Sequence, residues 1–153
     1  KAEVNFTGRF KVIGGGARVN WKGAGSLLVS SFPTETEGWS AHSKDHVHPD
    51  PSTITTFAIG MKSGFLKRMG LKRVLRSEYS SFGNNPSGEC RVGKKAAAIS
   101  AGIYAPVGSG SLMTGLAPIS RRRWFGSSKA HINPYQTSFE IACIGLRTIQ
   151  VKK

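Results

Sequence analysis

The chain has 153 residues, which is enough for one compact domain with a shared core but marginal for two independent domains. Its hydrophobic content of 39% is a little low for a globular chain, yet 19 Gly and 7 Pro punctuate it evenly, which indicates many short strands and turns and excludes a disordered chain. No apolar run of about 18 residues occurs, so the sequence predicts no transmembrane helix.

The net charge of +14 lies mostly in the second part of the chain. Residues 1–62 hold 7 basic and 5 acidic side chains, whereas residues 63–153 hold 15 and 3. This imbalance favours association with a polyanion such as nucleic acid or an acidic glycan, or contact with an anionic membrane surface. Charge by itself does not choose among these partners.

The first part of the chain is predicted to form strands. Residues 4–13 alternate loosely and end at the triplet Gly14-Gly15-Gly16, which indicates a strand that runs into a tight turn or a close backbone approach. Residues 26–32 form an apolar run that ends at Pro33, and residues 53–61 read TITTFAIGM, which is rich in β-branched and aromatic residues. Residues 64–76, GFLKRMGLKRVLR, lack helical periodicity and are predicted as a strand end followed by a basic connector.

An internal repeat organises the sequence. Residues 39–49 read WSAHSKDHVHP and residues 124–134 read WFGSSKAHINP, an offset of 85 residues. Holding that offset from residue 23 to residue 62 gives 12 identities in 40 positions, where unrelated stretches would give roughly 2 or 3. We therefore predict an all-β single domain, residues 1–153, built from two pseudo-symmetric repeats as a barrel or a sandwich. Repeat one covers about 4–68, a basic linker about 69–88, and repeat two about 89–153.

The repeated stretch is predicted to be a strand with two different faces. A period of two places Trp39, Ala41 and Ser43 on one face, which is apolar or small and is expected to be buried. The opposite face carries His42, Lys44, His46 and His48 and is expected to face solvent.

Lysine and histidine recur together on that second face. Lys44 with His46, and Lys129 with His131, are two residues apart, so each pair projects in one direction and is a candidate site for a phosphate, sulfate or carboxylate. The alternative is that the histidines bond neighbouring loops and the lysines are only solvated. A further alternative is a metal-independent nuclease or toxin in which His46 and His131 act as general acid and base and Lys44 or Lys129 stabilises the phosphate.

A metal site is a weaker candidate on the same strand. His42, His46 and His48 have the spacing HxxxHxH, which is compatible with zinc or copper, but the second repeat does not reproduce it. A polar surface strand explains the pattern equally well. We therefore predict neither a metal nor a cofactor.

Three arginines form another candidate ligand site. Arg121, Arg122 and Arg123 precede Trp124, and this combination can bind anionic groups bidentately and stack on bases or sugars. The alternative is a solvated charge run. A wider basic surface is expected from further cations, namely Lys94, Lys95, Lys152, Lys153 and those between Lys67 and Arg76.

The two cysteines, Cys90 and Cys143, fall on the first and last predicted strands of repeat two. If those strands are neighbours a disulfide fits, and otherwise both are buried thiols. We expect a secreted, non-enzymatic, lectin-like binding protein that recognises an anionic or carbohydrate polymer through two repeat-equivalent surfaces. The rivals are the nuclease or toxin described above and a basic structural or assembly protein.

Overall fold

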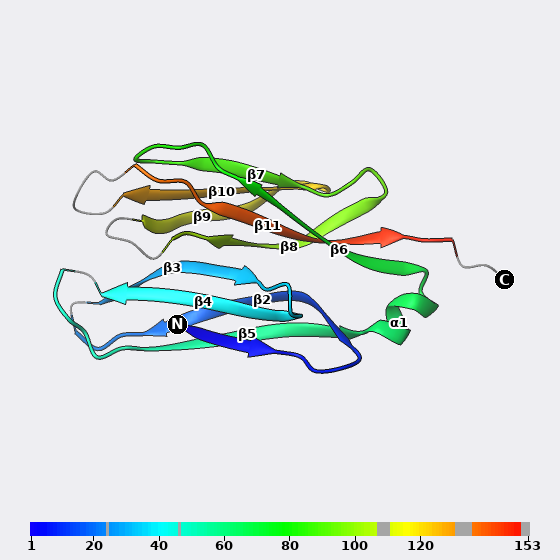
Figure 1. Ribbon diagram of the computed structural model, residues 1–153, viewed down its shortest axis with the longest axis horizontal. Helices are drawn as coiled ribbons and strands as arrows, with labels where there is room; N and C mark the ends of the chain where they lie inside the picture. The colour runs from blue at the N-terminus through cyan, green and yellow to red at the C-terminus, as the bar shows by residue number, and fades with distance from the viewer. Residues whose placement is uncertain (24, 46, 107–110, 131–135, 151–153) are drawn as a thin grey trace.

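The computed structural model describes the whole chain except residues 24, 46, 107–110, 131–135 and 151–153. The described residues form eleven strands and one short helix (Figure 1). In chain order these are β1 Ala2–Asn5, β2 Phe10–Asn20, β3 Ser26–Pro33, β4 Gly38–Asp45, β5 Thr53–Lys62, α1 Ser63–Arg68, β6 Leu71–Tyr79, β7 Ser87–Arg91, β8 Ala96–Tyr104, β9 Ser111–Ser120, β10 Arg123–Ala130 and β11 Glu140–Thr148.

The all-β prediction is confirmed. The strands form three antiparallel sheets with the orders β1-β4-β3-β8-β11-β6, β7-β10-β9 and β2-β5. These sheets do not close into a barrel, so the barrel alternative is wrong. The helix α1 and the strand β6 occupy the stretch that was predicted as a strand end and a connector. Among the described residues, no helix is long and apolar enough to cross a membrane.

Two hydrophobic clusters hold the sheets together. In the first, the three-stranded sheet packs on β8 and β11, with Ile103, Ile141 and Cys143 fully buried and Trp124 packed against them. The second cluster joins β2, β4 and β11 through Val12, Trp39 and Ile144. The period of two in a strand explains why β8 and β11 contribute to the first cluster as they do. Residues 101 and 103 share one face of β8, and residues 141 and 143 share one face of β11.

The repeated tryptophan stretch is more enclosed than its pattern predicts. Trp39 is 1% exposed, and its indole Nε1 donates a 2.8 Å hydrogen bond to Ser31 Oγ. Ser40, on the face predicted to meet solvent, is also 1% exposed, and the ring nitrogens of His42 are shielded from water. The first part of β4 is therefore covered on both faces, so the prediction of a solvent-facing side is wrong there.

Two groups of strands pair in the same way. The order β1-β4-β3 in the large sheet matches β7-β10-β9, and the pair β2-β5 matches β8-β11. The β3–β4 ladder shifts register between Leu28 and Ser30, and the β9–β10 ladder shifts between the partners of Ser127 and Ser128. The segment from α1 to β6 connects the two groups.

A candidate basic cleft at the β9–β10 turn

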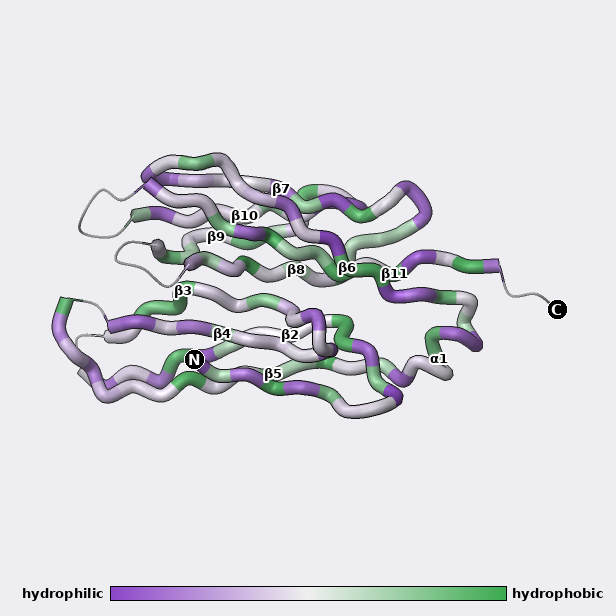
Figure 2. Tube along the Cα trace, in the orientation of Figure 1, coloured by the Kyte–Doolittle hydropathy of each residue, from purple (hydrophilic) through white to green (hydrophobic). Residues whose placement is uncertain are grey.

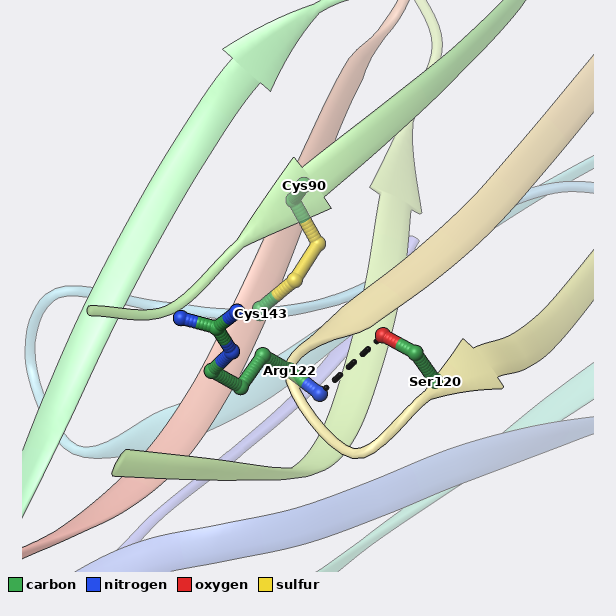
Figure 3. The surroundings of a disulfide bond; sticks show 4 residues. All are labelled: Cys90, Ser120, Arg122 and Cys143. Atoms are coloured by element: carbon green, nitrogen blue, oxygen red, sulfur yellow. Dashed lines mark hydrogen bonds between the residues drawn. A yellow bond between two sulfur atoms is a disulfide. The ribbon is translucent and has the colours of Figure 1, made fainter. Parts of the chain in front are cut away.

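The β9–β10 turn is fixed by backbone hydrogen bonds. The carbonyl of Arg122 accepts from Val92 N at 3.0 Å, and the carbonyl of Arg121 accepts from Ala98 N at 2.9 Å. Arg122 N donates to Ser120 Oγ at 3.3 Å (Figure 3). These bonds hold the turn against the connection between β7 and β8.

Two adjoining open cavities lie beside this turn, and we call them together the basic cleft. The larger measures about 440 Å³ and is lined by Arg76, Glu78, Arg91, Val92, Gly93, Lys94 and Arg122. The smaller measures about 200 Å³ and is lined by Val74, Arg76, Gly93, Lys94, Lys95, Ala96 and Arg147. The cavities share three lining residues and thus form one concave surface. The β7–β8 connection and the end of β11 are hydrophilic along this side (Figure 2).

The charge of the basic cleft is unbalanced. Six cationic side chains line it, and Glu78 is its single carboxylate. The four ion pairs within the described part of the chain use none of these residues. Because like charges repel, such a group is favourable only where solvent ions or a bound polyanion offset it.

A disulfide joins the strands that carry the cleft. Cys90 on β7 and Cys143 on β11 are bonded, with their Cα atoms 5.9 Å apart, and both are fully buried. Arg91 follows Cys90 directly, and Arg76 pairs with Cys143 in the β6–β11 ladder. The disulfide therefore fixes two of the cationic positions relative to each other. Such a bond is consistent with an extracellular or otherwise oxidising compartment.

The predicted arginine cluster divides among different environments. Arg122 lines the cleft, whereas Arg123 is exposed and pairs with Glu89 at 3.1 Å. Arg121 is exposed on the turn. Trp124 packs against the core, and its indole nitrogen is buried without a hydrogen-bond partner. In this structure the tryptophan thus acts as a packing residue.

The lysine–histidine pairs lie partly outside the described residues. His46 and His131 are not among those residues, so the nuclease hypothesis stays a prediction. Lys44 lies half-buried on β4, where burial lowers its pKa, and Lys129 is exposed on β10. Because β4 and β10 belong to different sheets, the two lysines are not neighbours in one ladder.

His42 lies in an aromatic environment. Its ring contacts Phe32 and Tyr104, with centroid distances of 5.8 and 6.0 Å. These side chains line a cavity of about 410 Å³ that also includes Glu140 and Ser77. Burial, reinforced by the charges at Lys1, lowers the pKa of His42. His48 is exposed, and the described residues contain no group of three metal-binding side chains.

The sequence did not reveal several cleft residues. Arg91, Arg147 and Glu78 line the cleft, but none of them stands in a run of like residues along the chain. One local signal for Glu78 was present. Arg76 and Glu78 are two residues apart, so on a strand they lie on the same face. No family model, curated protein or solved structure matches the chain, so the basic cleft is interpreted from its own side chains.

Proposed function

We propose that this protein binds an anionic polymer, with the basic cleft as its principal site. The observation that carries this proposal is that six cations from separate elements converge on one concave surface with a single carboxylate. Arginine guanidinium groups can bind sulfate, phosphate or carboxylate bidentately, and lysines add less directional attraction. The affinity would come from many weak contacts along the polymer.

An extracellular sulfated or acidic glycan is the ligand class that fits best. The disulfide favours an oxidising compartment, where such glycans occur. The lining residues include no aromatic side chain, whereas sites for single-stranded nucleic acid commonly stack bases on aromatic rings. The protein would therefore act as a secreted, charge-reading, lectin-like module.

The test uses heparin as a sulfated probe and measures affinity at several salt concentrations. The wild type should lose affinity steeply with salt, because binding releases counterions. Arg122→Gln and Arg76→Gln should each weaken binding by about three- to tenfold and reduce the salt slope by about one. Folding of each variant is checked by thermal unfolding.

Arg18→Gln is the matched control. Arg18 is exposed on β2, so this substitution removes the same charge at a position outside the cleft. An equal loss of affinity in Arg18→Gln would overturn the assignment of the cleft. Tighter binding to single-stranded RNA than to heparin would instead favour the nucleic-acid alternative. Salt-insensitive binding to a neutral glycan would contradict a charge-based site.

We also propose that the fold is a duplicated unit, and strand pairing supports this. Val4 pairs with Trp39 and Cys90 pairs with Trp124. The same correspondence relates Gly16 and Phe57 to Gly102 and Ala142. With this correspondence β1 and β2 lie 86 residues before β7 and β8, whereas β3, β4 and β5 lie 85 residues before β9, β10 and β11.

A further inference from the structure

The outer face of the two-stranded sheet exposes large apolar side chains. Phe57 and Ile59 on β5 are 52% and 56% exposed. They pair with Gly16 and Gly14 on β2. Gly14 is buried, and a Cβ placed there would meet Ser100 Oγ of β8 at 3.6 Å. The open surface is thus made of Gly16, Phe57 and Ile59, and we call it the β2–β5 face. An exposed apolar patch of this kind commonly marks a contact site.

The corresponding surface on β8 and β11 is buried. There Gly102 pairs with Ala142, and Ser100 pairs with Ile144. Ile144 is fully buried, although Ile59 at the matching position is 56% exposed. The two isoleucines at equivalent positions therefore differ in whether other strands cover them.

Strand β3 provides part of that cover. A Cβ atom added at Gly102 would collide with Phe32 Cα and Ser31 O, and it would lie 2.9 Å from Pro33 Cδ. Ser31 also pairs with Ile103 in the single registered position between β3 and β8. Gly102 is thus a glycine because another backbone crosses directly over it.

At Gly16 the neighbour is a side chain. The three atoms nearest to a Cβ placed there all belong to the Phe57 ring, with Cζ at 2.6 Å. Gly16 is not among the glycines with positive φ, so backbone conformation does not require glycine at this position. The Phe57 ring therefore lies over Gly16 where β3 lies over Gly102, and a crossing strand would take the place of this exposed ring.

The strand that corresponds to β3 is available. β9 is the edge strand of the three-stranded sheet, and its Leu116, Ala117 and Pro118 match Ser31, Phe32 and Pro33 at the offset of 85. Ala117 and Pro118 are exposed, and Ile119 is 45% exposed. Open edge strands readily pair with other chains.

We propose that β9 of a second copy of this chain crosses the β2–β5 face at Gly16, as β3 crosses β8 at Gly102. Each copy then gives one edge strand and receives another, which is a head-to-tail interface that builds a ring or a filament. This proposal depends on the duplicated fold and not on polyanion binding. The two also respond oppositely to salt, because screening the net charge of +14 favours self-association but weakens polyanion binding.

The test measures molar mass by sedimentation and light scattering over about a thousandfold range of protein concentration. The wild type should associate, and more so at higher salt. Ile59→Lys blocks the receiving face and Ala117→Lys blocks the edge strand, so each should weaken association by at least about tenfold. Phe82→Lys is the matched control, since Phe82 is 71% exposed in the β6–β7 connection and belongs to neither surface.

Mixing the two blocked variants distinguishes this interface from others. Each variant keeps one intact surface, so the mixture should form a one-to-one heterodimer and nothing larger. A wild type that stays monomeric throughout overturns the proposal. Association that persists in both variants, or that Phe82→Lys weakens equally, also overturns it. Heparin affinity measured on the same variants reports separately on the basic cleft.

Discussion

The β3–β4 turn and the β9–β10 turn share one backbone anchor but carry opposite charge. Phe6 N donates to Glu37 O at 3.0 Å in the first, and Val92 N donates to Arg122 O at 3.0 Å in the second. The side chain of Glu37 is 20% exposed and lines a cavity with Lys11 and Arg73, whereas that of Arg122 lines the basic cleft. The same corner is thus a structural junction in one half and a candidate binding surface in the other.

Glu37 pairs with two of the cations near the first corner. Its carboxylate pairs with Lys11 at 2.8 Å and with Arg73 at 3.5 Å, and it also accepts from Val12 N at 3.0 Å. Arg73 donates in addition to the carbonyl of Val12 at 2.7 Å. Arg122 takes that position in the β9–β10 turn and belongs to none of the ion pairs among the described residues, so the two corners differ in the sign of one side chain and in whether it is paired.

Removing the disulfide from the second half should have the largest effect on the free energy of unfolding. The bond closes a loop with a sequence separation of 53 residues, for which the chain-entropy relation gives about 4 kcal/mol of stabilisation. The double variant Cys90→Ala/Cys143→Ala should therefore unfold at a much lower guanidinium concentration. Its heparin affinity should also fall, because Arg91 and Arg76 lose their common anchor. An unchanged unfolding midpoint would contradict this role.

Neutralising Glu37 should have the next largest effect. In Glu37→Gln the guanidinium of Arg73, which is 11% exposed, loses its charged partner, and we expect a loss of about 1–3 kcal/mol in the free energy of unfolding. Glu89→Gln is the matched control, because the Glu89–Arg123 pair is 44% and 45% exposed and should contribute less than about 1 kcal/mol. Equal losses in urea unfolding would show that the first corner is not specially buried.

Adding a disulfide to the first half is the mildest test of the comparison. In the proposed duplication, Val4 and Ala58 correspond to the two cysteines, and both pack on the second core cluster. The variant Val4→Cys/Ala58→Cys should oxidise spontaneously and gain about 1 kcal/mol or more. Thiol titration detects the bond, and unfolding compares the oxidised and reduced forms. Thiols that stay free under oxidising conditions would argue against the duplicated fold.

Local chemistry accounts for the parts of the fold that the sequence predicted. β-Branched and alternating residues specified strands such as β5, and the separation of Cys90 and Cys143 on two such strands left a disulfide open as one of two alternatives. Helix α1 was missed because its six residues are too few to establish a periodicity. Strand β6 was missed because cations stand on both of its faces, Arg76 on the face of Val74 and Arg73 on the face of Leu75, so apolar and charged residues do not alternate along it.

Contacts between distant segments account for the errors at β4. Its alternating pattern correctly placed Trp39 and Ala41 inside, since both are buried. It could not reveal that side chains of other strands also cover the other face, where His42 lies against Phe32 and Tyr104. Residue type sets which face prefers the core, but only tertiary packing decides whether the second face meets water.

The sequence by itself determined the β class and the basic character of the second part of the chain, because both follow from residue type and local period. It also identified Arg122 as one of several candidates. Only the tertiary structure brought Arg122 beside Arg76, Arg91, Lys94 and Arg147, which are dispersed over more than half of the second part of the chain. Their proximity depends on strand register and on the Cys90–Cys143 bond, and no local pattern encodes either of these.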